Sequence, residues 1–517
     1  MAIAAAALGL AFLISYLLTP LVRRAAIRYD FVDRPDGKRK IQSNPVALGG
    51  GIMLLIAAPL VVGIVIAWWG PDLWLMTSQA SKEPGAIIGL AIAGILLAVV
   101  GLLDDGFGLR GSYKLLWQMI AAGLVMGTGL SVPKIGIFDY VLPLGTLGSL
   151  FAIVWLLGAI NSFNLIDGVD GLAGSVGVVF SLTFGVIAIL GGQQLEAIIA
   201  FALAGALLGF LRFNFPPATI YLGDAGSMFI GLVLGTIALR CSIKQAATLA
   251  FAAPLAIWSI PMFDSLAAVL RRKLTGRSIY ATDRGHIHHV LLTRGMSALQ
   301  AVSFIVFLCS ITCVGAIVSL YFKIEWLGFA TVLAVIGFLI FTRVFGHVEF
   351  VLLNARLFGF GRFLSRTATS EGDDEAKHTR VSLQGTRQWE ELWGALVESA
   401  QKFHLVKMQL NLSLPRLHES FYATWSKPGR HSKDLSWQAD IPLIVDGQSV
   451  GRLHVTGLQN EEYASKEMNQ FIDFVETLEL QLNLLIHQEV ARIEECSTQK
   501  KTLVDDSAAD EAIVERV

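Results

Sequence analysis

Four short clusters of polar side chains, all of types that can bind a metal ion or a phosphate, interrupt a sequence that is otherwise rich in apolar residues. They are Asp104-Asp105, the repeat Asn161, Asn164, Asp167 and Asp170, the turn Gly223-Asp224-Ala-Gly226-Ser227, and the run Asp283-Arg284-Gly-His286-Ile-His288-His289. The members of the second cluster recur every three residues, so on a helical stretch they form one polar stripe. Carboxylates from separate segments would repel one another at a shared site unless a cation joined them.

The side chains of these clusters favour a hard divalent cation. Oxygen ligands select Mg²⁺ or Mn²⁺ over zinc. The four cysteines form no paired metal motif; they are Cys241, Cys309, Cys313 and Cys496. A divalent cation beside Arg, Lys and His suits a phosphorylated substrate, because the ion bridges phosphate oxygens and neutralises developing charge. We therefore expect a Mg²⁺ or Mn²⁺ site that acts on a phosphate.

The elements that must position these clusters are membrane-spanning helices. Of the 517 residues, 54% are hydrophobic and only 16% are charged, against roughly 25% charged residues in an average soluble domain. At least eleven apolar stretches approach the ~20 residues that span a hydrocarbon core. They cover residues 2–22, 47–69, 85–103, 114–130, 146–162, 173–190, 195–214, 225–241, 247–270, 298–322 and 324–342. The sequence predicts an all-α polytopic membrane protein with about 11 transmembrane helices over residues 1–342.

The loops between these stretches predict the orientation of the chain in the membrane. Odd-numbered loops carry 16 Lys and Arg residues, and even-numbered loops carry five. By the positive-inside rule the odd loops face the cytoplasm, which places the N-terminus outside. All four polar clusters fall on the cytoplasmic side. Alone, each cluster could be a helix end, an N-cap, a turn or a surface loop, but their convergence on one face favours a site there.

Beyond residue 342 the pattern changes. Residues 343–386 comprise a basic and aromatic interfacial segment, expected to lie on the inner leaflet, and a polar linker over about 370–386. Residues 387–495 predict a soluble α+β domain with a helix at 389–403, strands at 406–414, 436–445 and 449–455, a hairpin turn at 446–447, and a long helix at 463–495. The last of these helices carries apolar residues at nearly heptad spacing. This apolar face would form a homodimer contact or pack on the domain's own sheet. The domain has no catalytic cluster and is expected to be regulatory or dimerising, and residues 496–517 form a disordered tail.

The motifs over residues 15–300 resemble those of the polyprenyl-phosphate N-acetylhexosamine-1-phosphate transferases, glycosyltransferase family 4. The matching stretches, in order, are Asp33-Arg-Pro-Asp36-Gly-Lys38-Arg39-Lys40, Leu103-Asp104-Asp105 with Lys114, Asn161-Ser-Phe-Asn164-Leu-Ile-Asp167-Gly-Val-Asp170-Gly, Asn214-Phe-Pro-Pro217 with Gly223-Asp224-Ala-Gly226-Ser227, and Pro261-Met-Phe-Asp264 with the histidine run. Two residues depart from the family pattern: Gln42 stands where His is typical, and Ala47 where Pro is common.

The resemblance implies a reaction and a set of roles. Within the family, the His-x-His-His signature is similar to that of undecaprenyl-phosphate N-acetylglucosamine-1-phosphate transferases of the bacterial inner membrane. The implied reaction transfers GlcNAc-1-phosphate from UDP-GlcNAc to a polyprenyl phosphate and releases UMP, the initiating step of lipid-linked cell-envelope glycan synthesis. The implied metal ligands are Asp224 and Asp104, with Mg²⁺ or Mn²⁺ as cofactor. Asp104, Asp105, Asp167 and Asp170 are the expected catalytic residues. The expected substrate-binding residues are Lys114, Asn161, Asn164, Asp264, Arg284, His286, His288 and His289.

Several alternatives remain open at this point. The donor could be UDP-MurNAc-pentapeptide or another UDP-N-acetylhexosamine, and the reaction could run directly or through an aspartyl phosphate. Asp264 lies inside a predicted span, where a carboxylate is either functional or held by an internal partner. A lipid-linked sugar transporter is the alternative from another class, although its ionisable groups should lie near the bilayer midplane. The expected partners are the sugar nucleotide, the polyprenyl phosphate and the bilayer, with no nucleic acid.

Overall fold

The computed structural model describes most of the membrane part and the core of the C-terminal part. The described residues are 2–34, 45–77, 84–128, 130, 132, 134–137, 140–244, 252–274, 285–351, 353, 377–384, 389–403, 405–414, 419–427, 436–445, 448–458, 476 and 483. The chain divides into two compact units: Met1–Leu270 with Tyr280–His347, and Arg271–Ile279 with Val348–Val517.

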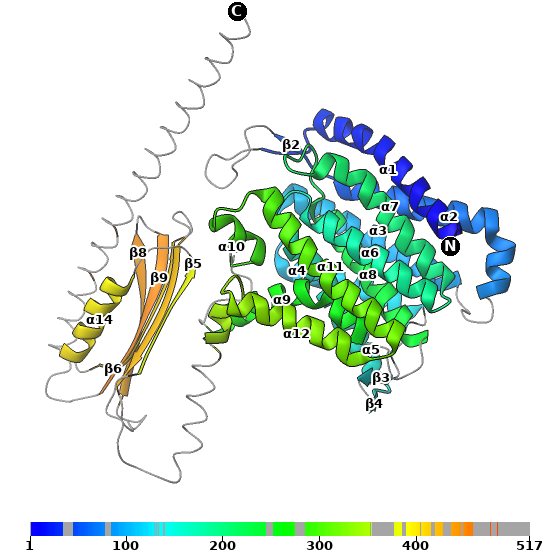
Figure 1. Cartoon of the computed structure of the whole chain (residues 1–517). Helices are drawn as coiled ribbons and strands as arrows, with labels where there is room; N and C mark the ends of the chain where they lie inside the picture. The colour runs from blue at the N-terminus through cyan, green and yellow to red at the C-terminus, as the bar shows by residue number, and fades with distance from the viewer. Residues whose placement is uncertain are drawn as a thin grey trace, which may run out of the picture. The chain divides into compact units, whose positions relative to one another are not determined.

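The first unit is a bundle of helices (Figure 1). They are α1 (Ala2–Arg28), α2 (Gly50–Thr77), α3 (Pro84–Phe107), α4 (Gly111–Gly127), α5 (Leu147–Ile166), α6 (Leu172–Leu190), α7 (Gln194–Asn214), α8 (Gly223–Lys244), α9 (Ala252–Leu274), α10 (Ile287–Thr293), α11 (Ala298–Phe322) and α12 (Glu325–Phe341). Every predicted span falls on one of these helices. Among the described residues, nine helices are long and apolar enough to cross a membrane, and α4 and α12 are shorter, with 17 residues each. The chain is a multi-pass membrane protein, as the sequence predicted.

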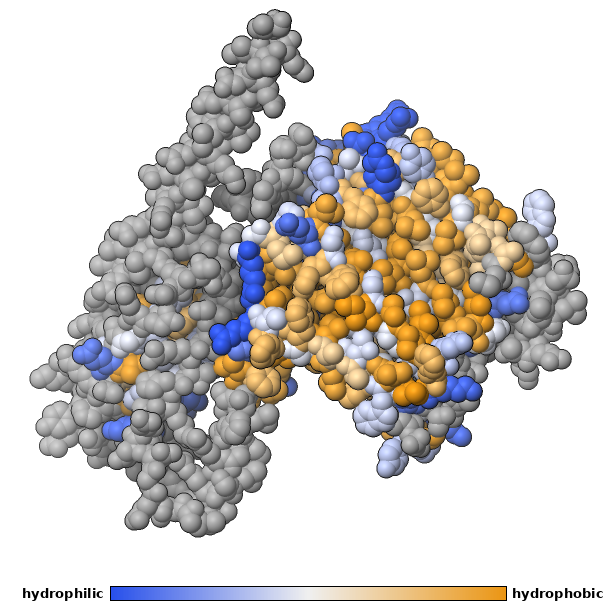
Figure 2. All heavy atoms as spheres, in the orientation of Figure 1, coloured by the Kyte–Doolittle hydropathy of each residue, from blue (hydrophilic) through white to orange (hydrophobic). Residues whose placement is uncertain are grey.

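Helix α8 lies at the centre of the bundle. It packs against α2, α3, α5, α6 and α7, and nearly all of its membrane-length stretch is buried. The outward faces of the surrounding helices are apolar, and Figure 2 shows hydrophobic residues covering the visible side of this unit. Such a surface requires lipid as its solvent. A helix enclosed in this way can carry a polar residue at its end without exposing that residue to lipid.

Four short strands join the helices at their ends. They form two antiparallel pairs, β1 (Val32–Asp33) with β2 (Val46–Ala47), and β3 (Lys134–Ile137) with β4 (Tyr140–Pro143). The strands β1 and β2 bring the two ends of the first loop together. Immediately after β2, the N–H groups of Gly50 and Gly51 donate to the carbonyl oxygens of Tyr221 and Leu222, both at 2.9 Å. The base of the first loop is therefore fixed beside the start of α8.

The second unit contains a five-stranded antiparallel sheet in the order β5-β7-β6-β9-β8. Its strands are β5 (Lys377–Gln384), β6 (Leu405–Leu414), β7 (Glu419–Ser426), β8 (Ser436–Val445) and β9 (Gln448–Leu458). Helix α14 (Glu390–Lys402) packs on β6 and places Trp393 and Leu396 in a core with Leu410 and Phe421. The predicted C-terminal α+β domain is therefore present.

The first segment of this unit, which begins at Arg271, packs against its sheet. Tyr422 on β7 packs against Leu274, Val348 and Val351. Close by in the chain, Arg271 forms an ion pair with Glu349. The last turn of α9 therefore groups with the C-terminal sheet.

Two strands of the second unit were not predicted from the sequence. The linker predicted over residues 370–386 is wrong where β5 forms, and β7 was not predicted at all. Only two of the eight residues of β5 are apolar, Val381 and Leu383, and at the edge of the sheet the strand needs to pair only with β7. The hairpin turn 446–447, nearly all of the helix 463–495, most of the segment 343–369 and the tail 496–517 lie outside the described residues.

Candidate active site

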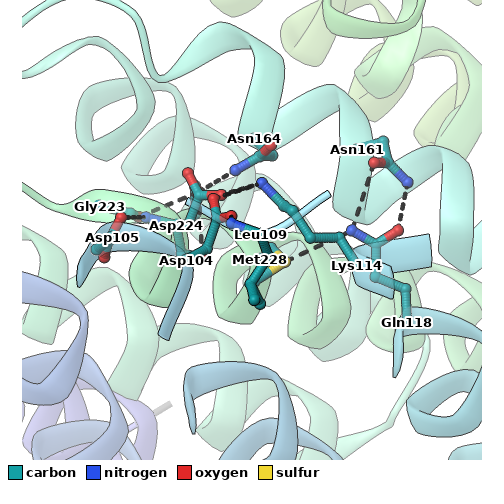
Figure 3. A network of polar contacts seen from close by, with 11 residues as sticks. Asp104, Asp105, Leu109, Lys114, Gln118, Asn161, Asn164, Gly223, Asp224 and Met228 are labelled. Atoms are coloured by element: carbon teal, nitrogen blue, oxygen red, sulfur yellow. Dashed lines mark hydrogen bonds and ion pairs between the residues drawn. The ribbon is translucent and has the colours of Figure 1, made fainter. Parts of the chain in front are cut away.

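The centre of the site is a lysine held between two carboxylates from different helices (Figure 3). Lys114, in the first turn of α4, donates from Nζ to Asp104 Oδ2 at 2.9 Å, and it also donates to Asp224 Oδ2. Asp104 Oδ1 accepts from the backbone N–H of Leu109 at 2.6 Å, which fixes the loop between α3 and α4. These three charged side chains are 16–25% exposed. A ligand can therefore reach them, while most of their surface is shielded from water.

Asp105 supports the second carboxylate through the backbone. Its Oδ1 accepts from the N–H of Asp224 at 3.0 Å, so it caps the start of α8. Its Oδ2 is buried and accepts no hydrogen bond from the described residues. Gly223 precedes Asp224 with φ +70°, and a β-carbon there would lie 2.4 Å from Asp105 Oδ2. Only glycine permits both this backbone conformation and this approach.

Small residues let three helices meet directly beneath Asp224. A β-carbon on Gly51 of α2 would lie 2.2 Å from the backbone nitrogen of Gly226, and one on Gly101 of α3 would lie 2.3 Å from that of Ala225. Close backbone contact at small residues is typical of helix packing in membranes. It fixes the position of the Asp224 backbone relative to α2 and α3.

The asparagines of the predicted stripe bond to neighbouring helices. The amide nitrogen of Asn161, Nδ2, donates to Gln118 Oε1 on α4 at 2.7 Å and to the carbonyl oxygen of Leu157 at 2.8 Å. One turn later, Asn164 Nδ2 donates to Ser227 Oγ on α8 at 3.2 Å. The stripe therefore faces α4 and α8, the same two helices that carry Lys114 and Asp224.

Asp167 lies just beyond the end of α5 in an acidic environment. Burial is the main reason that its pKa is raised well above the ordinary value, and the negative charges of Asp224, Asp105 and Asp170 raise it further. A cation that neutralises the neighbouring carboxylates would stabilise the ionised form of Asp167. This is the electrostatic setting expected next to a metal or at a proton-transfer position, and the predicted catalytic role of Asp167 stays a prediction.

Asp170 holds a loop. Its Oδ2 accepts from the N–H of Ala218 at 2.9 Å. In the same region, Asn214 accepts from the N–H of Gly171 at 3.1 Å and donates to the carbonyl oxygen of Ile220 at 2.9 Å. Together these bonds connect the turn after α5 to the loop that leads into α8. The geometry thus gives Asp170 a positioning role, and its predicted catalytic role stays a prediction.

Asp264 is 1% exposed, and both of its carboxylate oxygens have partners inside the protein. Oδ2 lies 2.9 Å from His286 Nδ1, and Oδ1 accepts from the N–H of Ile287 at 2.9 Å. This intramembrane carboxylate therefore orients the histidine run at the start of α10. This supports the alternative of an internal partner, through which Asp264 acts on His286, and its contact with substrate stays a prediction.

His288 connects the histidine run to the turn after α5. It is 1% exposed, its Nδ1 has no hydrogen-bond partner among the described residues, and a β-carbon on Gly168 would lie 2.3 Å from its Nε2. Burial, together with the neighbouring His289 and His286, lowers the pKa of His288 well below its ordinary value. A neutral imidazole adds no positive charge to the site, but it can still donate or accept a hydrogen bond.

The structure thus brings together Asp104, Asp105, Lys114 and Asp224. The asparagine stripe bonds to α4 and α8, and the histidine run contacts the turn after α5 and Asp264 on α9. Arg284 lies outside the described residues. Gln118 and Asn214 were given no role in the sequence analysis. Gln118 falls four residues after Lys114 in an apolar helix, a helical spacing that could have indicated it.

The donor set fits Mg²⁺ in kind. Among the described residues, no three His, Cys, Asp or Glu side chains are arranged to hold a metal ion together. Mg²⁺ is, however, commonly held by one or two carboxylates plus substrate phosphates. Asp224 and the unpartnered Oδ2 of Asp105 provide hard oxygens of that type. In this structure Asp104, predicted as a ligand, bonds to Lys114 and Leu109.

Comparison with known proteins identifies the family. Residues 87–242 match the profile of glycosyl transferase family 4. A probable undecaprenyl-phosphate N-acetylglucosaminyl 1-phosphate transferase of Bacillus subtilis (strain 168) is 31% identical over 362 residues, covering 69% of this chain and 96% of the relative.

Two further relatives come from other bacteria. A decaprenyl-phosphate N-acetylglucosaminephosphotransferase of Mycolicibacterium smegmatis is 32% identical, covering 60% of this chain and 81% of its own. An undecaprenyl-phosphate alpha-N-acetylglucosaminyl 1-phosphate transferase of Escherichia coli (strain K12) is 29% identical, covering 56% and 77%. The profile match contains Asp104, Lys114 and Asp224, and the chain covers nearly the whole length of the Bacillus protein. The chain therefore belongs to glycosyl transferase family 4, as its motifs predicted.

Proposed function

We propose that this protein transfers GlcNAc-1-phosphate from UDP-GlcNAc to undecaprenyl phosphate, or to a closely related polyprenyl phosphate, and releases UMP. The observation that carries the proposal is the Lys114 ammonium between Asp104 and Asp224, at the ends of α3, α4 and α8. A site at helix ends lets a phosphate anchored in the bilayer meet a nucleotide that arrives from water. The names of the relatives support the donor and the acceptor.

The reaction forms one bond and breaks one. An oxygen of the polyprenyl phosphate bonds to the phosphorus that carries the sugar, and the bond from that phosphorus to the UMP oxygen breaks, with its electron pair leaving on UMP. A phosphate monoester has a second pKa of about 6, so at neutral pH the attacking phosphate is mostly dianionic and needs little help from a base. The main tasks are alignment and charge neutralisation.

The chain's own residues are suited to those tasks. Lys114 provides a positive charge at the centre of the cluster, and Asp105 fixes the backbone of Asp224. The neutral His288, beside the turn that carries Asp167, can hydrogen-bond a phosphate oxygen or a sugar hydroxyl without adding charge. Asp224 and Asp105 would hold Mg²⁺, which would neutralise the diphosphate when bound.

The proposal includes an orientation in the bacterial inner membrane. The N-terminus lies outside, and the carboxylate cluster and the C-terminal sheet face the cytoplasm, where sugar nucleotides are found. The excess of Lys and Arg in the odd-numbered loops supports this orientation.

The test is an assay of purified protein in detergent with Mg²⁺, undecaprenyl phosphate and one UDP-sugar at a time. UMP release and formation of a lipid-linked sugar with UDP-GlcNAc are expected, and EDTA should abolish both until Mg²⁺ or Mn²⁺ is restored. A clear preference for UDP-MurNAc-pentapeptide or UDP-GalNAc would replace the proposed donor. Movement of a lipid-linked sugar across vesicles without UMP release would replace the reaction by transport.

A further inference from the structure

Gln118 is a buried polar residue in an apolar helix, and it reaches the site through another side chain. It is 1% exposed and lies one helical turn after Lys114 on α4. Its side-chain amide faces that of Asn161 on α5, with Asn161 Nδ2 donating to Gln118 Oε1 at 2.7 Å and Gln118 Nε2 donating to Asn161 Oδ1 at 3.4 Å (Figure 3). A buried amide costs free energy unless it is bonded, so this pairing accounts for its presence there.

The pairing fixes which end of the Asn161 amide remains available. Both hydrogens of Asn161 Nδ2 are used, one by Gln118 Oε1 and one by the carbonyl oxygen of Leu157 at 2.8 Å. Turning the amide over would set its oxygen against the Leu157 carbonyl oxygen, which is repulsive. Among the described residues, the oxygen Asn161 Oδ1 receives only the long bond from Gln118, so it retains accepting capacity.

Gln118 is itself oriented by its surroundings. Its Nε2 also lies 3.5 Å from the sulfur of Met228 on α8, a weak acceptor. The other neighbour of the Gln118 amide is Asn161, so the reciprocal pair is its main hydrogen-bonded contact. The orientation of Asn161 therefore depends on Gln118, whereas Asn164 is held separately by Ser227.

We infer that Gln118 is a positioning residue, which holds Asn161 so that it presents its carbonyl oxygen to a hydrogen-bond donor on the sugar nucleotide. This inference rests on the proposed function. Phosphate oxygens only accept hydrogen bonds at neutral pH, so they are excluded as partners of this oxygen. The groups that fit are N–H or O–H donors of the uridine or of the N-acetylhexosamine.

The test is a double-mutant cycle in the full-length protein with Gln118→Met, Asn161→Ala and the double variant. Gln118→Met keeps the volume and removes both amide bonds. It is expected to raise KM for UDP-GlcNAc by roughly tenfold, while kcat and KM for undecaprenyl phosphate change less than about threefold. Asn161→Ala should have a similar effect, and the double variant should be no worse than Asn161→Ala alone, because Gln118 acts through Asn161.

The same measurements locate the donor group. If the uridine provides it, the inhibition constant of UMP rises together with KM, and if the sugar provides it, only KM for UDP-GlcNAc rises. Thr236→Val on α8 is the matched control, since the Thr236 hydroxyl is buried and, within the part of the chain that the structure describes, donates only to the carbonyl oxygen of Leu232 on its own helix. This control should leave KM unchanged.

Two results would overturn the inference: an unchanged KM in Gln118→Met, or independent, multiplicative effects of the two substitutions. If Gln118→Met does not fold, Gln118→Glu is used in the same cycle, since it keeps the acceptor for Asn161 Nδ2 and should raise KM less than Asn161→Ala does. If the wild-type protein turns over no UDP-sugar, the proposed function fails. The cycle is then run on the dissociation constant of UDP-GlcNAc, and additive effects or an absence of binding would reject the role of Gln118.

Discussion

Gly168 and His288 lie so close together that a β-carbon on Gly168 would come within 2.3 Å of His288 Nε2. This contact joins the turn that follows α5 to the histidine run of α10. Gly168→Ala should therefore displace the imidazole, because a contact of this length is not possible between non-bonded heavy atoms. We expect kcat for UMP release to fall at least tenfold while the protein remains folded.

The control for this substitution is Gly123→Ala on α4, where a β-carbon would meet nothing within 4 Å. It should leave kcat unchanged and slightly raise the melting temperature, since alanine is the better helix former. Normal turnover in Gly168→Ala would show that the position of His288 does not matter for catalysis.

Asp224→Asn should reduce UMP release by roughly a hundredfold or more, because it removes a negative charge from the candidate metal site with little change in shape. Thermal unfolding in detergent should be nearly unchanged, since Lys114 keeps its bond to Asp104. Asp440→Asn in the C-terminal sheet, where Asp440 has only an exposed partner in Arg452 at 3.7 Å, is the matched control. Turnover close to wild type in Asp224→Asn would remove this residue from the site.

The stability of the protein should depend on pH through His288. Its pKa is lowered in the folded state, so below about pH 6.5 the unfolded chain binds a proton at this position that the folded chain does not. The free energy of unfolding should therefore fall on acidification, by up to about 1.4 kcal/mol per pH unit from this residue, until the folded-state pKa is reached.

Melting temperatures measured between pH 7.5 and 5 check this expectation. His288→Gln should show a shallower loss of stability than wild type, and His454→Gln in the C-terminal sheet controls for the removal of an imidazole elsewhere. Parallel curves for wild type and His288→Gln would contradict the buried, neutral state of His288.

The proposed orientation predicts which loops an impermeant thiol reagent can reach in intact cells. In a protein without its native cysteines, Ala80→Cys or Tyr140→Cys should be labelled, while Asp36→Cys, Gly108→Cys and Tyr280→Cys should be shielded until the membrane is permeabilised. The expectation follows from the uneven distribution of Lys and Arg among the loops. Labelling of Tyr280→Cys from outside would reverse the orientation and remove the candidate site from the cytoplasm.

A chain that ends at residue 369 should still release UMP, since every candidate site residue precedes residue 290. Its melting temperature should fall, because Leu274, Val348 and Val351 lose the apolar cover of Tyr422. Tyr422→Ala in the full-length protein should lower the melting temperature in the same direction without changing kcat. A truncated protein that is folded and binds UDP-GlcNAc but cannot turn over would show that the C-terminal part contributes to the reaction.

The spans could be predicted because they depend on local sequence. The length of a run of apolar residues is visible in the sequence itself. The loop charges predict that the four polar clusters share one face of the membrane, and this stays a prediction. The partners of each atom could not be predicted, since they depend on how helices pack. Asp104 and Asp224 were assigned to a metal, yet the geometry places Lys114 between them, and Asp264 proved to hold His286.

The missed residues have a similar explanation. Gln118 belongs to no motif. Its proposed role depends on its hydrogen bond with Asn161, which lies on another helix. The strand β5 carries little apolar alternation, and its pairing with β7 is set by a segment distant in the chain. In both cases the information lies in a tertiary contact rather than in the local sequence.

The pairing of Lys114 with Asp104 has a consequence for how the protein is made. These two residues belong to consecutive helices, α3 and α4, so their ion pair can form as soon as α4 has been synthesised. Asp224 enters much later, with α8. A charge at the centre of a membrane segment costs about 3 kcal/mol during insertion, and less towards the end of the segment, where Asp104 and Lys114 lie. Because Lys114 and Asp104 neutralise each other, the hairpin of α3 and α4 can insert into the bilayer before α8 has been synthesised.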